Sequence, residues 1–248
     1  AVHDIGEGTG IFGEIGRLEL VELPEPEPGL GQRLLSVTHC ALCRTDAKMW
    51  QKGHRDLVLP RILGHELVVA DPTGGRSYAV WPGEACASCL QCLSGRENLC
   101  PHMRIIGFHR DGGFAERICV SEQSLLELPD GVDHRLATLA EPLACALNGL
   151  EQLGEIPFAG NALIVGSGAI GVMMARLLLR RGIEQLAIAD ISAEKLRIAR
   201  QLLPAQVAGI DSRINDLVES REISRIPVYV DSPMAITATQ IFARHADA

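Results

Sequence analysis

The sequence predicts an α/β fold in which a parallel sheet begins near residue 161. The first observation is the segment NALIVGSGAIGVMMARLLLRRGIEQLAIAD, residues 161–190, which reads as strand, glycine turn, helix and strand. The second is composition: 47% of the 248 residues are hydrophobic and 22% are charged, which is enough apolar material for a packed core and argues against disorder. A chain of this length forms one or two domains.

The elements of this segment follow one another in a fixed order. Residues 161–165 supply an apolar strand, and Gly166, Gly168 and Gly171 form a G-x-G-x-x-G turn. An apolar helix follows as far as Arg181, and Gly182 is placed to end it. Residues 186–189 form the second strand. We therefore expect a strand–helix–strand unit with its glycine turn at the start of the helix.

The glycine turn predicts a dinucleotide site. Gly166 permits the tight turn, Gly168 lets a pyrophosphate approach backbone amides, and Gly171 lets the helix pack closely on the strand. The positive end of the helix then faces the phosphate charge. Asp190, 19 residues after Gly171, can accept hydrogen bonds from a ribose 2′-hydroxyl and would repel a 2′-phosphate. This arrangement favours NAD over NADP as the cofactor.

Charge and hydropathy exclude several other classes. The chain has 23 Lys and Arg against 31 Asp and Glu, a net charge of −8, whereas phosphate-backbone binders usually carry the opposite sign. The N-terminus lacks the basic and apolar regions of a signal peptide. The apolar run at residues 162–179 contains Ser167, Arg176 and three glycines, so it does not read as a membrane helix. We expect no nucleic-acid or membrane partner and a cytoplasmic location.

Four cysteines in the segment CASCLQCLSGRENLC predict a structural zinc site. Their spacing is C-x2-C-x2-C-x7-C, which two unstrained disulfides could not easily satisfy. Four thiolates close the coordination shell of one tetrahedral Zn²⁺. The surrounding loop has little predicted secondary structure, so a metal can replace a missing core there. The ligands would be Cys86, Cys89, Cys92 and Cys100.

A second, more dispersed set of residues predicts a catalytic zinc. Cys43 lies in HCALCRTD, His65 and Glu66 lie in LPRILGHELVVA, and Glu141 lies in LAEPLACALNGL, where Pro142 suits a helix start. One thiolate, one imidazole and one or two carboxylates leave a coordination position open for water or substrate. Whether Glu66 or Glu141 is the third direct ligand is left open by the sequence.

The order of these motifs resembles the zinc-dependent medium-chain dehydrogenase/reductase family, which includes alcohol, polyol and threonine dehydrogenases. The resemblance covers residues from about 11 to about 210 and includes CRTD, GHE, the four-cysteine loop, DGGFAER, AEPLAC and the glycine turn. It implies an α/β plus β chain: a GroES-like catalytic domain followed by a Rossmann domain, with the active site between them. The implied domains are residues 1–150, a partial Rossmann domain at 151–213, and an atypical segment at 214–248.

The resemblance also implies roles for individual residues. Cys43 and His65 match the ligands of the catalytic zinc, Glu66 matches a carboxylate that ligates in some members, and Glu141 matches an acidic residue at or near the metal. Thr45 matches the hydroxyl that passes the substrate proton outward, and Asp46 is placed to orient a ligand histidine. Cys40 precedes the motif and is expected to be a small buried hydrophobe.

One position departs from the family pattern. Where many alcohol dehydrogenases continue the proton relay with a histidine, this chain has Lys48, and His54 lies nearby but not at the matching position. The relay beyond Thr45 can therefore run through water, Lys48 or a cofactor hydroxyl.

The C-terminal stretch allows two interpretations. In the first, residues 207–210 and 227–230 are the third and fourth strands of an abbreviated Rossmann sheet, with helices at 214–223 and 235–244. In the second, RIPVYVDSPMAITATQIFARH resembles a segment of the β-CASP region of metallo-β-lactamase-fold nucleases, with Asp231 capping a strand. We favour the second, which suggests a fusion. A nuclease function does not follow, because no HxHxDH motif is present.

Two functions of different classes follow from these expectations. The first is an oxidoreductase that transfers a hydride from a small secondary alcohol or polyol to NAD, with one catalytic and one structural zinc. The acidic composition is compatible with a homo-oligomer. The second is a catalytically impaired remnant that binds zinc and nucleotide. Intact ligand residues favour the first, and the expected loss of the later Rossmann strands favours the second.

Overall fold

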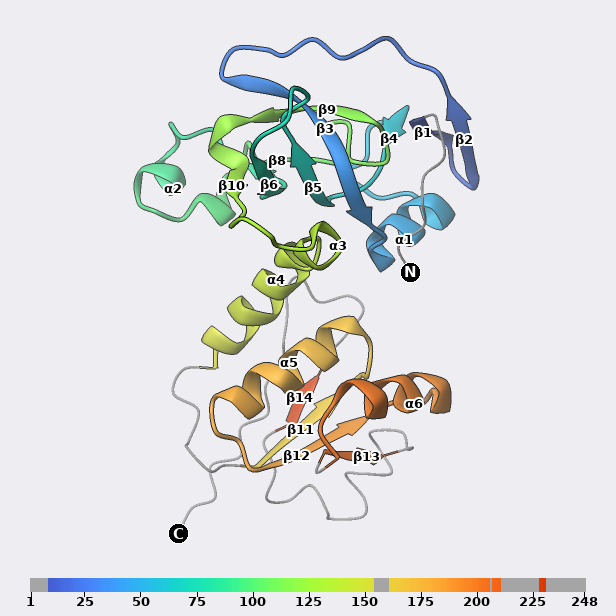
Figure 1. Ribbon diagram of the computed structural model, residues 1–248, viewed down its shortest axis with the longest axis vertical. Helices are drawn as coiled ribbons and strands as arrows, with labels where there is room; N and C mark the ends of the chain where they lie inside the picture. The colour runs from blue at the N-terminus through green and yellow to red at the C-terminus, as the bar shows by residue number, and fades with distance from the viewer. Residues whose placement is uncertain (1–8, 154–160, 206, 211–227, 231–248) are drawn as a thin grey trace. The chain divides into compact units, whose positions relative to one another are not determined.

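A computed structural model of the chain describes residues 9–153, 161–205, 207–210 and 228–230 (Figure 1). Its contacts divide the chain into two compact units, residues 1–141 and 142–248. The division falls before the predicted boundary at residue 150 because α4, Ala140–Glu151, buries Ala146 and Leu150 in the core of the second unit. The predicted boundary at residue 213 lies outside the described residues.

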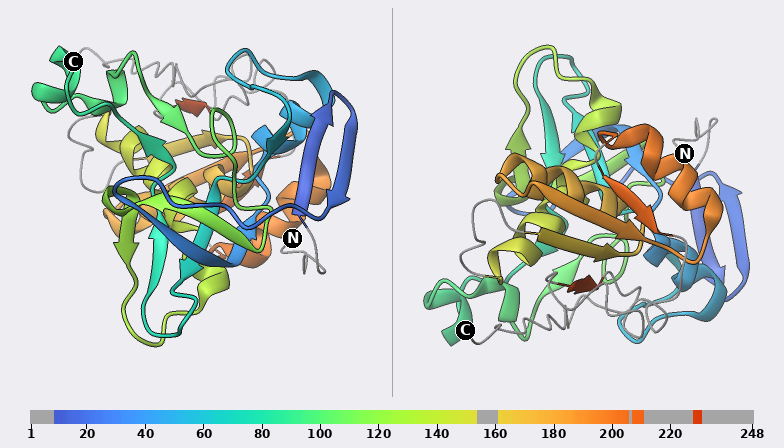
Figure 2. Two further views of the ribbon diagram at one scale, coloured as in Figure 1. Left: turned by 90° about the horizontal axis from the view of Figure 1, so that it is seen from above. Right: turned by 90° about the horizontal axis from the view of Figure 1, so that it is seen from below.

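The first unit is built on an antiparallel five-stranded sheet with the order β10-β6-β5-β3-β9. Its strands are β3 (Gln32–Ala41), β5 (Glu66–Ala70), β6 (Ser77–Val80), β9 (Arg117–Ser121) and β10 (Leu125–Glu127). Figure 2 shows the long strand β3 running across this unit with β9 beside it. In β9 burial alternates, with Ile118 and Val120 inward, as expected for a strand with one face on a core.

Two small sheets and several short helices complete the first unit. One sheet joins β1 (Thr9–Glu14), β2 (Arg17–Val21) and β4 (Arg61–Ile62), and the other joins β7 (Gly83–Glu84) and β8 (Arg104–Ile105). The helices are α1 (Arg44–Lys52), α2 (Leu90–Leu93), η1 (Glu97–Leu99), η2 (Glu122–Ser124) and α3 (His134–Ala137). The core of the unit includes Leu35, Leu67, Val69 and Ile106, all at most 2% exposed.

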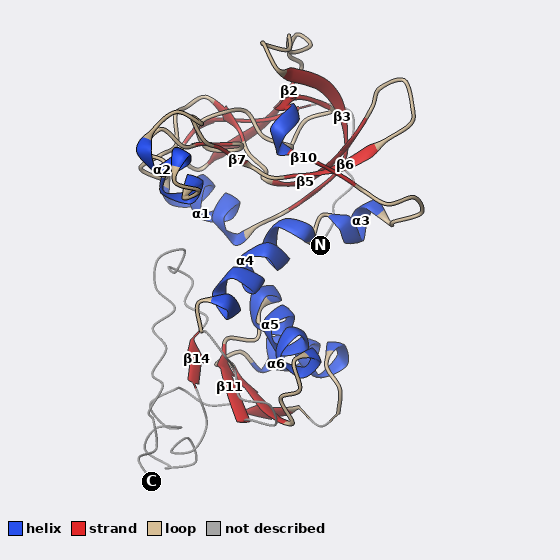
Figure 3. Cartoon of the chain, turned by 90° about the vertical axis from the view of Figure 1, so that its left-hand side faces the viewer, coloured by secondary structure: helices blue, strands red, loops and turns tan. Residues whose placement is uncertain are grey.

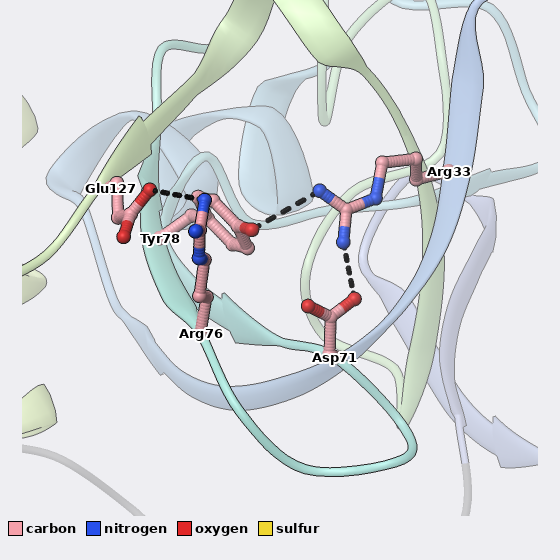
Figure 4. Close-up of polar contacts among 5 residues, drawn as sticks. All are labelled: Arg33, Asp71, Arg76, Tyr78 and Glu127. Atoms are coloured by element: carbon pink, nitrogen blue, oxygen red, sulfur yellow. Dashed lines mark hydrogen bonds and ion pairs between the residues drawn. The ribbon is translucent and has the colours of Figure 1, made fainter.

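A polar cluster ties β3 to the hairpin between β5 and β6 (Figure 4). Arg33 donates a hydrogen bond to Tyr78 Oη at 3.1 Å and forms an ion pair with Asp71. The same guanidinium lies 5.1 Å from the centre of the Tyr78 ring, a cation–π geometry. Arg76 and Glu127 pair across β6 and β10 at 3.0 Å. This end of the sheet is therefore held by side chains as well as by the strand ladder.

The second unit contains the predicted parallel sheet. Its strands β11 (Asn161–Val165), β12 (Gln185–Ala189), β13 (Ala208–Ile210) and β14 (Val228–Val230) have the order β13-β12-β11-β14, and every pair is parallel. Helices α5 (Ala169–Arg180) and α6 (Ala193–Leu202) lie on one face of it (Figure 3). With β11 as the first strand, this order is 3-2-1-4, the order of a doubly wound nucleotide-binding sheet.

The predicted elements of the second unit are confirmed within the described residues. Strand β11 has the predicted bounds, and Gly182, with φ 89°, follows the C-terminus of α5. Strands β13 and β14 take the third and fourth places of the sheet, as the abbreviated-sheet interpretation predicts. The expected helices at 214–223 and 235–244, and Asp231 of the favoured β-CASP comparison, lie outside the described residues.

The core of the second unit lies between the sheet and its helices. Ile164 and Ile188 from the strands pack with Ala175 and Leu178 from α5 and Leu196 from α6, each at most 1% exposed. No helix among the described residues is long and apolar enough to cross a membrane.

Candidate functional site

Helix α1 begins at Cys43, and its first turn fixes the geometry of the candidate zinc site. Cys43 is the N-cap: its Sγ accepts from the backbone N–H of Thr45 at 3.5 Å, and Asp46 Oδ2 accepts from the backbone N–H of Cys43 at 3.0 Å. This reciprocal pair is a capping box in which a thiol replaces the usual hydroxyl. The spacing of Cys43 and Asp46 in CRTD is therefore what places the thiol at the helix start.

The register of β3 and β5 brings His65 and Glu66 to the same place. Glu66 begins β5 and lies opposite Ala41, near the end of β3, while Cys40 lies opposite Leu67. Cys43 follows the end of β3 by two residues, so it emerges beside the start of β5. Both His65 and Glu66 are 7% exposed. The strand pairing, rather than the spacing along the chain, brings these residues together.

Cys43, His65 and Glu66 form a group whose ligand atoms all lie within 4.8 Å of one another. Burial lowers the pKa of His65, but hydrogen bonds and charges from Asp46 and Cys43 outweigh it and raise this pKa to about 11. Burial raises the pKa of Glu66, and the positive charge of His65 opposes that rise. These surroundings favour a positive charge at the centre of the group, so the donor set fits a bound divalent cation.

Asp46 orients the imidazole of this group. It is 2% exposed, and its Oδ1 lies 3.3 Å from His65 Nδ1 and accepts from the backbone N–H of Gly64 at 3.3 Å. A carboxylate on Nδ1 leaves the other ring nitrogen, Nε2, for a metal and fixes the direction of the ring. The ring of Phe108, whose centre is 5.5 Å from that of His65, packs on the imidazole from the apolar side.

Three other residues that the sequence analysis discussed, Thr45, Glu141 and Cys40, lie outside the group of Cys43, His65 and Glu66. Thr45 is half-buried in the first turn of α1. Glu141 is not one of the three clustered residues, but its charge raises the pKa of Glu66, so the two carboxylates are close. Cys40 is 7% exposed in the apolar core, as expected for a small hydrophobe, and burial raises its pKa well above the usual value.

The four predicted thiols of the loop lie together, with all their sulfur atoms within 4.8 Å of one another. The Sγ–Sγ distances are 3.4 Å from Cys89 to Cys92, 3.9 Å from Cys86 to Cys92 and 3.9 Å from Cys89 to Cys100. A tetrahedral ion with Zn–S bonds of about 2.3 Å requires sulfur atoms about 3.8 Å apart. The cluster therefore has the size that one Zn²⁺ needs.

The electrostatics of the loop fit the same ion. Hydrogen bonds from Ser88, and then from Cys89, lower the pKa of Cys86 to about 5. Burial and the neighbouring thiols raise the pKa of Cys92 to about 12. Backbone N–H groups of Cys86 and His102 point to Cys100 Sγ at 3.4 Å. These hydrogen-bond donors stabilise the thiolate form of the cysteines. Without a metal the crowded thiols would keep some of their protons, and a divalent cation would displace those protons on binding.

The glycine turn between β11 and α5 has the geometry of a phosphate cradle. Gly166 has φ 110°, and a Cβ on Gly171 would overlap the carbonyl oxygen of Gly166. Gly168 is the N-cap of α5, has no side-chain cap, and opens to free space where a Cβ would stand. The first N–H groups of α5 are thus available to an anion. The turn fits the pyrophosphate of a dinucleotide.

Asp190 follows β12 and reaches back to the same turn. Its Oδ2 accepts from Ser167 N at 2.8 Å and Ser167 Oγ at 3.1 Å, and its Oδ1 accepts from Ser192 N at 2.9 Å. Lys195 Nζ lies 3.8 Å from Oδ2. Burial raises the pKa of Asp190, but these donors and Lys195 outweigh burial and lower it. The sequence predicted this carboxylate but not its contact with the Ser167 hydroxyl.

Comparisons with known proteins agree with this architecture. A family model described as the alcohol dehydrogenase GroES-like domain matches residues 29–130. The chain is 35% identical to D-altritol 5-dehydrogenase of Agrobacterium fabrum over 215 residues, which are 81% of this chain and 63% of that protein. It is 34% identical to L-galactonate-5-dehydrogenase of Escherichia coli K12 over 187 residues, which are 71% of this chain and 54% of that protein.

A solved structure shows the same fold. A protein of Sinorhizobium meliloti 1021, described as a zinc-binding dehydrogenase bound to NADP, superposes with a TM-score of 0.77. It is 29% identical, and the match covers 94% of this chain and 67% of that one. The chain therefore has the fold of proteins described as zinc-binding dehydrogenases, with a GroES-like unit followed by a Rossmann-type unit. The chain belongs to the zinc-dependent medium-chain dehydrogenase/reductase family, and it spans between half and two thirds of the length of these two curated relatives.

Proposed function

We propose that this chain oxidises a secondary hydroxyl of a small polyol or related sugar derivative and transfers the hydride to NAD. The observation that carries the proposal is the buried group of Cys43, His65 and Glu66, whose ligand atoms lie within 4.8 Å of one another beside Asp46. The relatives support the substrate class, since they are named for D-altritol, L-galactonate, sorbitol and L-threonine.

Three side chains would hold the catalytic Zn²⁺: Cys43 through Sγ, His65 through Nε2 and Glu66 through a carboxylate oxygen. When bound, Zn²⁺ acts as a Lewis acid and lowers the pKa of the substrate hydroxyl. Glu141, close enough to Glu66 to raise its pKa, would adjust the charge of the site or hold a water molecule there. Cys86, Cys89, Cys92 and Cys100 would hold a second, structural Zn²⁺ with no open position.

The proton and the hydride of the substrate would go to different acceptors. Thr45, two residues after the ligand Cys43, would take up the hydroxyl proton through Oγ1 and pass it to solvent. Bound at the glycine turn, NAD would supply the acceptor for the hydride of the carbon that carries the hydroxyl, and that carbon would become a carbonyl. Gly166, Gly168 and Gly171 would hold the pyrophosphate, and Asp190 would accept a ribose hydroxyl.

The experiment is NADH formation by the full chain across a panel of polyols and sugar acids, with zinc measured on the same samples. We expect turnover with at least one polyol and about two zinc ions per chain. Two zinc ions with bound NADH but no turnover on any substrate would favour the alternative, a zinc- and nucleotide-binding protein without catalytic activity.

Replacement of one ligand tests the catalytic assignment. Cys43→Ser removes a thiolate from the catalytic group, so we expect turnover to fall by at least about a hundredfold while the four-cysteine site keeps its metal. Cys119→Ser is the matched control, because Cys119 lies in β9 and its thiol contacts only the carbonyl of Pro26 among the contacts described. Equal activity of Cys43→Ser and Cys119→Ser would contradict the proposal.

A further inference from the structure

Hydrogen-bond donors of the protein itself already fill most of the acceptor positions of the Asp190 carboxylate. It is 7% exposed and accepts three hydrogen bonds: from Ser167 N and Ser167 Oγ on Oδ2, and from Ser192 N on Oδ1. A carboxylate offers about four acceptor positions. Oδ2 is therefore filled by one residue, and Oδ1 keeps one position for a ligand.

The hydroxyl on Oδ2 comes from inside the glycine turn itself. Ser167 is the residue between Gly166 and Gly168, and it is 5% exposed. Its backbone N–H would contact Asp190 whatever side chain stood there, but its Oγ contact at 3.1 Å exists only because the residue is serine. The side chain thus adds a second donor to an oxygen that already has one.

One positively charged side chain faces the same oxygen. Lys195, from the first turn of α6, has its Nζ 3.8 Å from Asp190 Oδ2 and is about half exposed. Together with the Ser167 hydroxyl it offsets the negative charge of the carboxylate on the side where it meets the turn. Hydrogen bonds to an ionised group are among the stronger ones in proteins, so the loss of one changes this charge balance noticeably.

We propose that the hydroxyl of Ser167 is a specificity-determining group that weakens the discrimination of this site between NAD and NADP. By occupying Oδ2, it leaves Asp190 a single acceptor position for the ribose and reduces the repulsion that the carboxylate exerts on a 2′-phosphate. This inference rests on the proposed function, because it requires that a nicotinamide dinucleotide binds at the turn.

Removal of the hydroxyl should act on the two cofactors in opposite directions. In Ser167→Ala, Oδ2 regains an acceptor position, so a ribose with free 2′- and 3′-hydroxyls can bind both carboxylate oxygens. The same oxygen loses a donor that offset its charge, so a 2′-phosphate is repelled more strongly. A role limited to stabilising the turn would weaken the binding of both cofactors equally.

The test is calorimetric titration of the full chain with NADH and with NADPH, which needs no turnover. We expect the ratio of Kd for NADPH to Kd for NADH to rise by about threefold to tenfold in Ser167→Ala. Ser167→Thr restores the hydroxyl and should return the ratio toward the wild-type value. Ser192→Asn is the matched control: it removes a hydroxyl from the same region but keeps a side-chain oxygen that can accept from Lys195 N at the start of α6. Ser192 contacts Asp190 through its backbone N–H, so the ratio should stay within about twofold.

Different results would reject different proposals. If the wild-type chain binds neither NADH nor NADPH, the proposed function fails and this inference fails with it. If both cofactors bind the wild-type chain and the ratio in Ser167→Ala is unchanged or falls, the role of Ser167 is wrong and the proposed function stands. A ratio that rises equally in Ser167→Thr would also overturn the inference, because the hydroxyl would not be its cause.

Discussion

At the scale of single residues, Asp46 connects three parts of the candidate zinc site. One oxygen accepts from the backbone of Cys43 at the start of α1, and the other faces His65 Nδ1 and accepts from the backbone of Gly64. One buried side chain thus positions two candidate ligands, Cys43 and His65, which come from different segments of the chain. Mutation of a side chain that hydrogen-bonds to a metal ligand commonly lowers the metal affinity by about one to two orders of magnitude.

Asp190 makes a testable contribution to stability that depends on pH. Its donors lower its pKa below the unfolded value near 3.9, so it stabilises the folded state above that value and loses this effect as the pH falls through its folded pKa. We therefore expect Asp190→Asn to lower the unfolding temperature at pH 7, and we expect its difference from wild type to shrink as the pH falls below the unfolded value near 3.9.

The measurement is thermal unfolding of the full chain at a series of pH values. The Glu194→Gln variant serves as the control, because Glu194 lies four residues after Asp190, in the first turn of α6, and pairs with Arg197 on the exposed side of that helix. We expect its effect at neutral pH to be smaller than that of Asp190→Asn. A constant difference between wild type and Asp190→Asn from pH 3 to pH 7 would disprove the linkage.

At the scale of elements, the sequence predicted the second unit more completely than the first. The strand, turn, helix and strand from Asn161 to Ala189 follow local rules: apolar periodicity, glycine positions and a helix stop. The approach of Cys43 to His65 and Glu66 depends instead on the register of β3 against β5, which pairs residues about 25 positions apart. Local pattern does not determine such a register, so the residue types and the family resemblance indicated the members of this group but not the strand pairing that brings them together.

Some site contacts could have been found in the sequence and others could not. Cys43 and Asp46 have the spacing of a capping box, which predicts a helix starting at residue 44. The contact of Ser167 with Asp190 joins two strand ends through a side-chain hydroxyl, and serine in a glycine turn has no pattern that predicts this partner. The glycine-turn pattern indicated Asp190 as a cofactor residue but carried no information about its contact with Ser167.

The four-cysteine loop makes a prediction at the scale of one element. Its described part from Cys86 to Cys100 contains only the short helices α2 and η1, so a metal bound by the four thiols would take the place of a core there. Cys100→Ser should release about one zinc ion per chain and increase hydrogen exchange between residues 86 and 100, while β3 and β5 stay protected.

Metal analysis and exchange mass spectrometry on the same sample would check this expectation. Cys119→Ser again supplies the control, since it removes a thiol from β9 without touching the loop. Full retention of zinc in Cys100→Ser, or loss of protection across the whole first unit, would contradict a local structural role for this site.

At the scale of the whole molecule, the two units carry separate cores and separate ligand sites. The first unit packs around residues such as Leu35 and Val69 and holds both groups of candidate zinc ligands. The second packs around Ile164, Ile188 and Leu178 and holds the glycine turn. Because a ligand stabilises only the part of the protein whose folded form it binds, metal and dinucleotide should act on different unfolding transitions.

Calorimetric unfolding of the full chain tests this separation. NADH at about 100 times its Kd should stabilise the second unit by about 2.7 kcal/mol. It should therefore raise the temperature of that unit's unfolding transition and leave the other transition unchanged. A zinc chelator should lower the temperature of the other transition only. The candidate zinc ligands Cys43, His65 and the four loop cysteines all precede residue 142 and so belong to the first unit. Hydrogen exchange at β5 and β11 would assign each transition to its unit. If chelation and NADH shifted one shared transition, the units would unfold together, and the separate cores would not represent separate folding units.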